Sequence, residues 1–319
     1  MNIVVTGAAG FIGSHLAETL AHQGHTVVGI DSFTDYYSAR LKQANAEDIE
    51  AAGVSLHRLD LATDDLSPAL DGVEFVFHLA GQPGISASTP LADYVRNNVV
   101  ATDKLLTACR QQNSLRCFVN VSTSSVYGRH AYDPEDAAPK PTSYYGVTKL
   151  AAEQLALAAH REKGFPACSL RLFSVYGPRE RPEKLYPKLI RSILTDTPFP
   201  LHEGSQSHSR SFTYVADIVA GFVSVLDRPE RVIGEIVNLG SDVEMTTGQG
   251  IALIEQIMGK EAKFDIKPKR PGDQLHTCAN IAKARQLLGY TPHIQLEEGL
   301  KAEVDWYVNR IFANGLHHS

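Results

Sequence analysis

The chain has 319 residues, 43% of them hydrophobic, which is enough for one large domain or for two lobes. A formal net charge of -6 excludes the broad basic surface that nucleic acid requires, and no apolar run approaches the roughly 18 residues of a membrane span. The four cysteines stand far apart with no histidine at metal-ligand spacing, so we expect no metal, no disulfide framework and a cytoplasmic location.

The first half of the chain alternates between strand-like and helical patterns. We predict strands over residues 3–6, 26–30, 54–58, 75–79, 117–121 and 167–172, and helices over 11–23, 92–110 and 144–163. A loop over 32–35 leads into a polar helix that we expect to be a solvated flank. Alternation of this kind predicts an α/β fold with a doubly wound parallel (Rossmann) sheet.

After Ser174 the pattern loosens, with several prolines and shorter, mixed elements. We therefore predict a dinucleotide-binding domain over residues 1–174 and a smaller mixed α/β substrate lobe mainly over 175–319. Residues 215–226 and 236–239 are apolar enough to return to the main sheet, so segments within about 210–240 are expected to belong to the first domain.

A glycine-rich turn, Gly7-x-x-Gly10-x-x-Gly13, lies between the first predicted strand and helix, with Phe11 and Ile12 inside it. Glycines let the backbone approach a pyrophosphate, whose charge is met by the free amides of the helix start. Asp31 follows Gly13 by 18 residues at the end of the second strand, where a carboxylate accepts both ribose hydroxyls of NAD and repels a 2′-phosphate. These features predict NAD as cofactor.

Residues at other strand ends complete the predicted cofactor set. Asp60 and Leu61 follow the third strand and are placed to meet adenine, although Asp60 could instead be a cap or a turn residue. The short segment Leu79-Ala80-Gly81 follows the fourth strand and leaves room for ribose and pyrophosphate. The remaining members of the set are Ser32 and Phe173.

Tyr145 and Lys149 stand four residues apart in the predicted helix 144–163, so their side chains share one face. An ammonium beside a phenol favours the phenolate and makes it a usable base near neutral pH. Together with the glycine-rich turn, the pair predicts hydride transfer coupled to proton removal by Tyr145.

The sequence resembles the extended short-chain dehydrogenase/reductase family in Gly7-x-x-Gly10-x-x-Gly13, His78-Leu79-Ala80, the run 121–128 and Tyr145-x-x-x-Lys149. Segments beginning at Arg171, Arg210 and Arg270 are similar to the nucleotide-sugar branch, so the resemblance covers about residues 2–300. It implies a tightly held NAD, Tyr145 as base, Lys149 bound to the nicotinamide ribose and Thr123 orienting the reacting oxygen.

The resemblance also narrows the reaction. Dehydratases of this branch carry Asp-Glu after the catalytic threonine, and uronate decarboxylases carry a glutamate at the second position, where this chain has Ser124 and Ser125. A 4-epimerase remains. The segments 34–37 and 177–182 look most like those of UDP-glucuronic acid 4-epimerases.

For such a substrate, the resemblance places Arg181 on the sugar carboxylate, with Ser124, Ser125 and Ser174 as further donors. It assigns Arg210 and Arg270 to the UDP pyrophosphate and Asp273 to the uridine ribose, although each could be structural. Relatives carry arginine where this chain has Ser86.

Three alternatives stay open: a neutral UDP-sugar 4-epimerase, a UDP-glucuronate decarboxylase, and a catalytically silent NAD-binding protein. We also expect a homodimer formed by the helix 144–163 and the one before it, a pairing typical of the family. The apolar residues that would suit this interface, or equally a core, are Val99, Leu105, Leu106, Leu150, Leu155 and Leu157.

Overall fold

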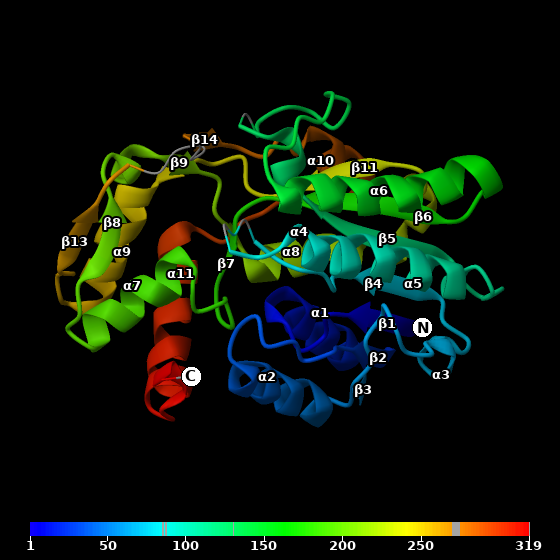
Figure 1. The fold of residues 1–319 in the computed structure, drawn as a ribbon, viewed down its shortest axis with the longest axis horizontal. Coiled ribbons are helices and arrows are strands. Elements are labelled where there is room, and N and C mark those ends of the chain that lie inside the picture. Colours follow the sequence, from blue (N-terminus) through cyan, green and yellow to red (C-terminus); the bar gives the residue numbers. More distant parts are fainter. Residues whose placement is uncertain (85, 87, 130, 270–274, 319) are drawn as a thin grey trace.

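The computed structural model describes residues 1–84, 86, 88–129, 131–269 and 275–318. Among them, seven parallel strands form the central sheet in the order β11-β6-β5-β4-β1-β2-β3 (Figure 1). Its strands are β1 Asn2–Thr6, β2 Thr26–Ile30, β3 Ser55–His57, β4 Phe75–His78, β5 Cys117–Thr123, β6 Ala167–Leu172 and β11 Ile236–Leu239. The predicted doubly wound parallel sheet is confirmed, and β11 joins it as predicted.

Helices cover both faces of this sheet. They are α1 Phe11–His22, α2 Ala39–Ala51, α3 Ser67–Leu70, α4 Leu91–Tyr94, α5 Ala101–Cys109, α6 Tyr144–Lys163, α8 Val215–Asp227 and α10 Ala282–Leu288. Side chains alternate along β1, so Ile3 and Val5 pack with α1 and α8, whereas Val4 packs with α5 and α6. Burial on both faces explains why these strands are continuous hydrophobic runs.

The second half of the chain adds a lobe with its own hydrophobic core, built largely from α7, α9 and α11. Its elements are β7 Val175–Tyr176, α7 Leu185–Leu194, β8 Phe199–His202, β9 Ser209–Arg210, β10 Thr213–Tyr214, β12 Met245–Thr246, α9 Thr247–Met258, β13 Phe264–Lys267, β14 His276–Thr277 and α11 Leu296–Trp306. Short 3₁₀ turns occur at η2 Ser124–Tyr127, η3 Ser205–Ser207, η4 Pro229–Arg231 and η6 Leu316–His318, and a π-helical turn at η5 Tyr307–Phe312. The domain boundary near residue 174 stays a prediction.

Two predicted helices differ from those observed. The helix predicted over 92–110 is present as one continuous helical segment, but it consists of α4, a π-helical turn at η1 Val95–Val100 and α5. The wider turn lets Asn98 point inward while Val95 and Val100 stay exposed. The helix predicted as a solvated flank, α2, is partly buried, and its Asn45 donates a hydrogen bond to the carbonyl of Ala9 at 3.0 Å.

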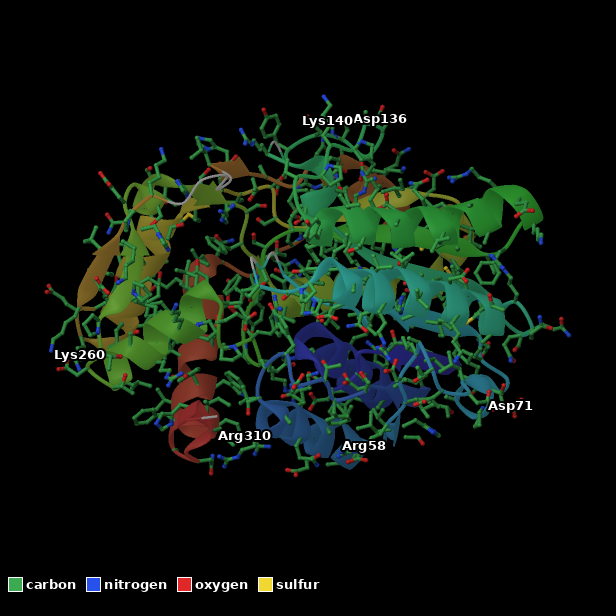
Figure 2. The ribbon with its side chains drawn as sticks, in the orientation of Figure 1. Arg58, Asp71, Asp136, Lys140, Lys260 and Arg310 are labelled. Carbon is green, nitrogen blue, oxygen red and sulfur yellow. The ribbon has the colours of Figure 1, made fainter. Side chains whose placement is uncertain are left out.

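Charged side chains tie the C-terminal lobe to the helices of the sheet. Arg179 pairs with Glu18 on α1 at 2.7 Å and with Asp48 on α2 at 3.1 Å. Arg310, which Figure 2 shows between the C-terminal helix and α2, pairs with the same Asp48 at 2.6 Å. His15 on α1 hydrogen-bonds the carbonyl of Pro178. The segment after β7 is therefore anchored beside the glycine-rich turn.

Within the described part of the chain, no helix has the length and apolarity needed to cross a bilayer.

Candidate active site

The carboxyl ends of the parallel strands form the edge at which the predicted functional residues gather. Asp31 follows β2, and Thr123 ends β5. The strand order reverses between β1 and β4, and open α/β sheets bind ligands in the crevice beyond such a reversal. This edge is the candidate active site.

The glycine-rich turn has a backbone shape that side chains would destroy. Gly7 has a left-handed φ of 71°, and a Cβ on it would lie 2.9 Å from the amide nitrogen of Ala80. A Cβ on Gly13 would overlap the carbonyl oxygen of Gly7, which accepts a hydrogen bond from the Gly10 amide at 3.0 Å. No described side chain caps α1, and its first turn is free of acidic residues. The turn therefore leaves helix amides for an anionic group.

Phe11 and Ile12, the first residues of α1, are half-buried and pack against the core beneath the turn. Their side chains hold the start of the helix against the sheet.

Asp31 is buried and already engaged on both carboxylate oxygens. Oδ2 accepts a hydrogen bond from the Ala9 amide at 3.1 Å and Oδ1 one from the Phe33 amide at 2.8 Å. Nζ of Lys42, on α2, lies 4.0 Å from Oδ1. Burial lowers the pKa of Lys42, and the charge of Asp31 opposes that shift. Sequence reasoning missed this ammonium beside Asp31.

The side chain of Asp60 is held by groups of the chain itself. It accepts hydrogen bonds from Nη2 of Arg96 at 2.6 Å and from the Ala62 amide at 2.9 Å. Partial burial acts against ionisation, yet these bonds lower the pKa of Asp60. The structure thus gives Asp60 the turn role that the sequence left open, and its adenine contact stays a prediction.

The other predicted cofactor residues differ in exposure. Ser32 and Gly81 are exposed, Leu79 and Ala80 are half-buried, and Leu61 and Phe173 are buried.

Tyr145 lies in the first turn of α6. The helix starts there because Ser143 caps it, accepting a hydrogen bond from the Gly146 amide at 3.1 Å. Burial raises the pKa of Tyr145, whereas a side-chain hydrogen bond with Thr123 and the charge of Arg181 lower it. The structure therefore brings Tyr145 together with Thr123, from β5, and with Arg181, from the segment after β7.

Lys149 lies one turn further along α6 and is buried. Burial lowers its pKa to about 8, and the charge of Glu153 opposes this shift. Its Nζ lies 4.0 Å from the position of a Cβ on Gly81, so the ammonium faces the loop after β4. Its charge is not among the largest influences on the pKa of Tyr145. That Lys149 favours the phenolate of Tyr145 stays a prediction.

Asn98 is a site residue that sequence reasoning missed. It is buried in the π-helical turn, accepts a hydrogen bond from the Gln82 amide at 2.7 Å and donates one to Oγ1 of Thr148 at 3.0 Å. It joins the loop after β4 to the helix that carries Tyr145 and Lys149. In the sequence, the feature that could have revealed Asn98 is the pair Asn97-Asn98 inside an otherwise apolar helical pattern.

Arg181 is the cation of the substrate side. Its side chain is 13% exposed, and Nη1 lies 3.1 Å from Oε1 of Glu183. The geometry of that ion pair is not that of a hydrogen bond, and buried Nη1 has no hydrogen-bond partner among the described residues. The guanidinium near Tyr145 therefore has an unused donor.

The three predicted serines lie close to the same strand ends. Ser124 and Ser125 open η2 and are half-buried, and Oγ1 of Thr123 accepts from the Ser125 amide at 3.2 Å. Ser174 is half-buried, and its carbonyl accepts from the Thr213 amide at 2.8 Å.

The predicted UDP-binding residues are less fully described. Arg210 lies on β9 and is half-buried. The pKa of Lys184 is lowered mainly by burial and by the charge of Arg181, and the charge of Arg210 adds to this effect. Arg270 and Asp273 lie outside the described residues.

The fold and this site define a dinucleotide-binding α/β enzyme with a threonine, a tyrosine and a lysine gathered at one sheet edge. The sequence profile of the NAD dependent epimerase/dehydratase family matches residues 3–240. The chain belongs to this family.

Known proteins of similar sequence and structure include nucleotide-sugar epimerases. A UDP-glucuronate 4-epimerase of Arabidopsis thaliana is 34% identical over 331 residues, covering 97% of this chain and 76% of the relative. An uncharacterized UDP-glucose epimerase of Bacillus subtilis (strain 168) is 40% identical over 309 residues, covering 95% and 97%. The structure of a UDP-glucuronic acid 4-epimerase from Bacillus cereus in complex with UDP-glucuronic acid and NAD has a TM-score of 0.91 and 40% identity, covering 96% of this chain and 98% of that chain.

Proposed function

We propose that this protein catalyses the NAD-dependent 4-epimerisation of UDP-glucuronic acid to UDP-galacturonic acid through a 4-keto intermediate. The observation that carries the proposal is Arg181, a largely buried guanidinium close to Tyr145 with an unused donor. A planar guanidinium suits a carboxylate, which distinguishes a uronic acid from a neutral sugar. The similarity to enzymes named for this reaction supports the same substrate.

The residues at the sheet edge fit NAD. Gly7, Gly10 and Gly13 form a cradle that any side chain at these positions would fill. The start of α1 offers free amides to a pyrophosphate. Asp31 would hold the adenosine ribose, and Lys149 the nicotinamide ribose. The further contacts that we propose are made by Phe11, Ile12, Ser32, Asp60, Leu61, Leu79, Ala80, Gly81 and Phe173. When bound, NAD supplies the hydride acceptor and donor for one sugar carbon.

Tyr145 is the proposed acid and base. Its phenolic oxygen would take the proton of the sugar 4-hydroxyl and later return it, because loss of a carbinol hydrogen as hydride requires loss of the hydroxyl proton. Thr123, hydrogen-bonded to Tyr145, would orient the reacting oxygen and stabilise the phenolate. One base can serve both faces of the sugar if the keto sugar turns about its diphosphate link between the two transfers.

Arg181 would also protect the intermediate. A 4-keto uronate is a β-keto acid, which loses carbon dioxide when the bond to the carboxyl carbon aligns with the carbonyl π system. Holding the carboxylate near the ring plane suppresses this loss. Ser124, Ser125 and Ser174 are the proposed additional donors, and Arg210, Arg270 and Asp273 the proposed contacts to UDP.

A neutral UDP-sugar 4-epimerase is the second candidate, and Ser86 is the observation that favours it. Its hydroxyl accepts hydrogen bonds from the amides of Ser88 and Thr89 at 3.2 and 3.1 Å, so this position caps a turn and offers no cation. A UDP-glucuronate decarboxylase is disfavoured because Ser125 provides no carboxylate.

One assay separates these functions. Purified protein is incubated with UDP-glucuronate and no added cofactor, and nucleotide sugars and carbon dioxide are followed. The proposal requires UDP-galacturonate with little carbon dioxide. A UDP-pentose with stoichiometric carbon dioxide would identify a decarboxylase, and turnover of UDP-glucose alone a neutral-sugar epimerase. Absence of turnover with all UDP-sugars, despite bound NAD, would identify a silent NAD-binding protein.

We further propose a homodimer through α6 and the helical segment from α4 to α5, which pack side by side (Figure 1). The residues first suggested for the interface are only partly suitable, because Leu105, Leu106 and Leu157 are buried in the core. The large hydrophobic side chains exposed on these helices are instead Leu91, Val95, Val100, Tyr144 and Val147. Light scattering should give a dimer for the natural chain and a monomer for Val95→Glu combined with Val147→Glu; a monomeric natural chain refutes the proposal.

We also propose a cytoplasmic location. Sγ of Cys117 and Sγ of Cys168 lie 3.9 Å apart on neighbouring strands without forming a disulfide, and all four cysteines are free. Unbonded thiols in such proximity suit a reducing compartment. Fractionation of the native cells, with detection of the protein outside the cytoplasmic fraction, would contradict this location.

A further inference from the structure

Tyr36 meets the substrate-side arginine although it comes from the cofactor side of the chain. It lies between β2 and α2, five residues after Asp31, and is half-buried. The guanidinium carbon of Arg181 lies 5.7 Å from the centre of the Tyr36 ring. Burial raises the pKa of Tyr36, and the charge and a side-chain hydrogen bond of Arg181 oppose that shift. The ring of Tyr36 therefore contacts the guanidinium of Arg181, and the charge of Arg181 acts on the Tyr36 hydroxyl.

Gly84 shows how tightly this contact is enclosed. A Cβ on Gly84 would lie 3.1 Å from the Tyr36 hydroxyl and 3.6 and 3.7 Å from Nη1 and Nη2 of Arg181. The Gly84 carbonyl accepts a hydrogen bond from the hydroxyl of Tyr94 at 2.8 Å, and the rings of Tyr94 and Tyr145 lie 6.5 Å apart. The loops after β2, β4 and β7 thus meet at Arg181, beside the proposed base.

This arrangement restricts the guanidinium in a useful way. A cation over an aromatic face is attracted by the ring quadrupole, and a planar guanidinium that stacks on a ring keeps its edge available for a carboxylate. Among the described carboxylates, Glu183 forms an ion pair with Arg181, but its side chain is exposed and Nη1 makes no hydrogen bond with it. Tyr36 is the contact that can fix the orientation of the guanidinium.

We propose that Tyr36 is a specificity-determining positioning residue, which holds Arg181 in the orientation that binds and restrains the carboxylate of the sugar. The proposal rests on the proposed function and extends it to a residue of the loop that follows Asp31. If Arg181 restrains the carboxylate less firmly, the 4-keto uronate loses carbon dioxide more readily. The C5–C6 bond breaks, its electron pair forms an enolate with the C4 carbonyl, carbon dioxide leaves, and C5 then takes a proton from water.

The test compares Tyr36→Ala, which removes ring and hydroxyl, with Tyr36→Phe, which keeps the ring. Tyr37→Phe is the matched control, since its ring lies under Lys42, 5.2 Å from Nζ. For Tyr36→Ala we expect KM for UDP-glucuronate to rise about tenfold, the size of a partly desolvated cation–π contact, with a smaller change in kcat. Carbon dioxide released per epimerisation should rise severalfold. Tyr36→Phe should lie between the natural chain and Tyr36→Ala, and Tyr37→Phe should match the natural chain.

A double-mutant cycle with Arg181→Met assigns the effect to the arginine. If Tyr36 acts through Arg181, Tyr36→Ala changes neither KM nor carbon dioxide release in the Arg181→Met background. Equal effects in both backgrounds, or an unchanged KM in Tyr36→Ala, overturn the proposal. Should Tyr36→Ala fail to fold, the cycle is run with Tyr36→Phe. Failure of the proposed function is visible separately, as absence of uronate turnover in the natural chain.

Discussion

Tyr145 is the residue on which the proposed chemistry depends most directly. We predict that Tyr145→Phe lowers kcat with UDP-glucuronate by roughly 10²- to 10⁴-fold, the usual contribution of a positioned acid–base group. The change removes one hydroxyl and leaves the ring beside Tyr94, so the fold and bound NAD should persist. The measurement is turnover together with NAD released on denaturation. A variant with near-natural turnover would refute Tyr145 as the base.

Thr123 should control the pH at which Tyr145 works. Its hydrogen bond lowers the pKa of Tyr145 against the effect of burial, so its removal raises that pKa and leaves less phenolate at neutral pH. We predict that Thr123→Val lowers kcat at pH 7 by about tenfold per unit of pKa rise, and that the rate recovers as pH increases. Thr123→Ser, which keeps the hydroxyl, is the control. A pH profile that Thr123→Val leaves unmoved would contradict this role.

At the scale of elements, α6 depends on a buried ion pair beneath it. Glu153, one turn after Lys149, accepts hydrogen bonds from Nε and Nη2 of Arg171 on β6 at 2.9 and 2.6 Å. Arg171 also stacks on Tyr127, with its guanidinium carbon 4.8 Å from the ring centre. The bond from Nη2 joins two almost fully buried groups. The pair ties the helix of the proposed base to the sheet.

Replacing one partner of this ion pair should lower the free energy of unfolding more than replacing both. We predict that Arg171→Met lowers the free energy of unfolding by about 3–5 kcal/mol, because it leaves the carboxylate of Glu153 buried without a counter-ion. Arg171→Met combined with Glu153→Leu should recover part of that loss. Urea unfolding of the two variants tests this difference. A double variant that is less stable than Arg171→Met would show that charge burial is not the dominant effect.

Elements specified by local signals were predictable from the sequence. The helix over 144–163 has its observed bounds because Ser143 caps its start and Gly164 takes a left-handed conformation at its end. The π-helical turn at Asn98 was not predictable, because periodicity alone does not reveal one extra residue in a turn. Contacts such as Lys42 with Asp31 and Tyr36 with Arg181 were missed because they join loops and helices whose meeting depends on the whole fold.

At the scale of the whole molecule, two buried carboxyl groups join the lobe to the site. Glu303 lies on α11, and Glu180 lies in the segment that carries Arg181; both are buried, and each shifts the pKa of the other. Burial raises the pKa of Glu180 to about 8, and burial and the charge of Glu180 raise the pKa of Glu303. Lys184 and Arg181 act on Glu180 in the opposite direction. Burial therefore favours the protonated form of both carboxyl groups.

The raised pKa values of these carboxyl groups make the stability of the protein depend on pH. Because the folded pKa of Glu180 lies above its ordinary value of 4.5, the stabilisation is present at low pH and is lost as pH rises toward about 8. Burial lowers the pKa of His78 to about 3 and that of His15 to about 4. These two groups make the protein more stable as pH rises, but only below their ordinary pKa of 6.5. The pKa of Lys149 is lowered from 10.5 to about 8, so this group also makes the protein more stable as pH rises, but only above pH 8. Between pH 6.5 and 8 we therefore expect the carboxyl pair to lower the stability as pH rises.

We predict that the melting temperature falls by a few degrees between pH 6.5 and 8, at roughly 2–4 °C for each kcal/mol lost in a chain of this size class. In the variant that combines Glu180→Gln with Glu303→Gln, both positions are neutral at every pH, so the fall should disappear. Differential scanning calorimetry across this range measures both proteins, with NAD content checked at each pH because bound cofactor also stabilises the fold. A natural protein whose melting temperature rises from pH 6.5 to 8, or a double variant that retains the same fall, would show that the carboxyl pair is ionised in the folded state.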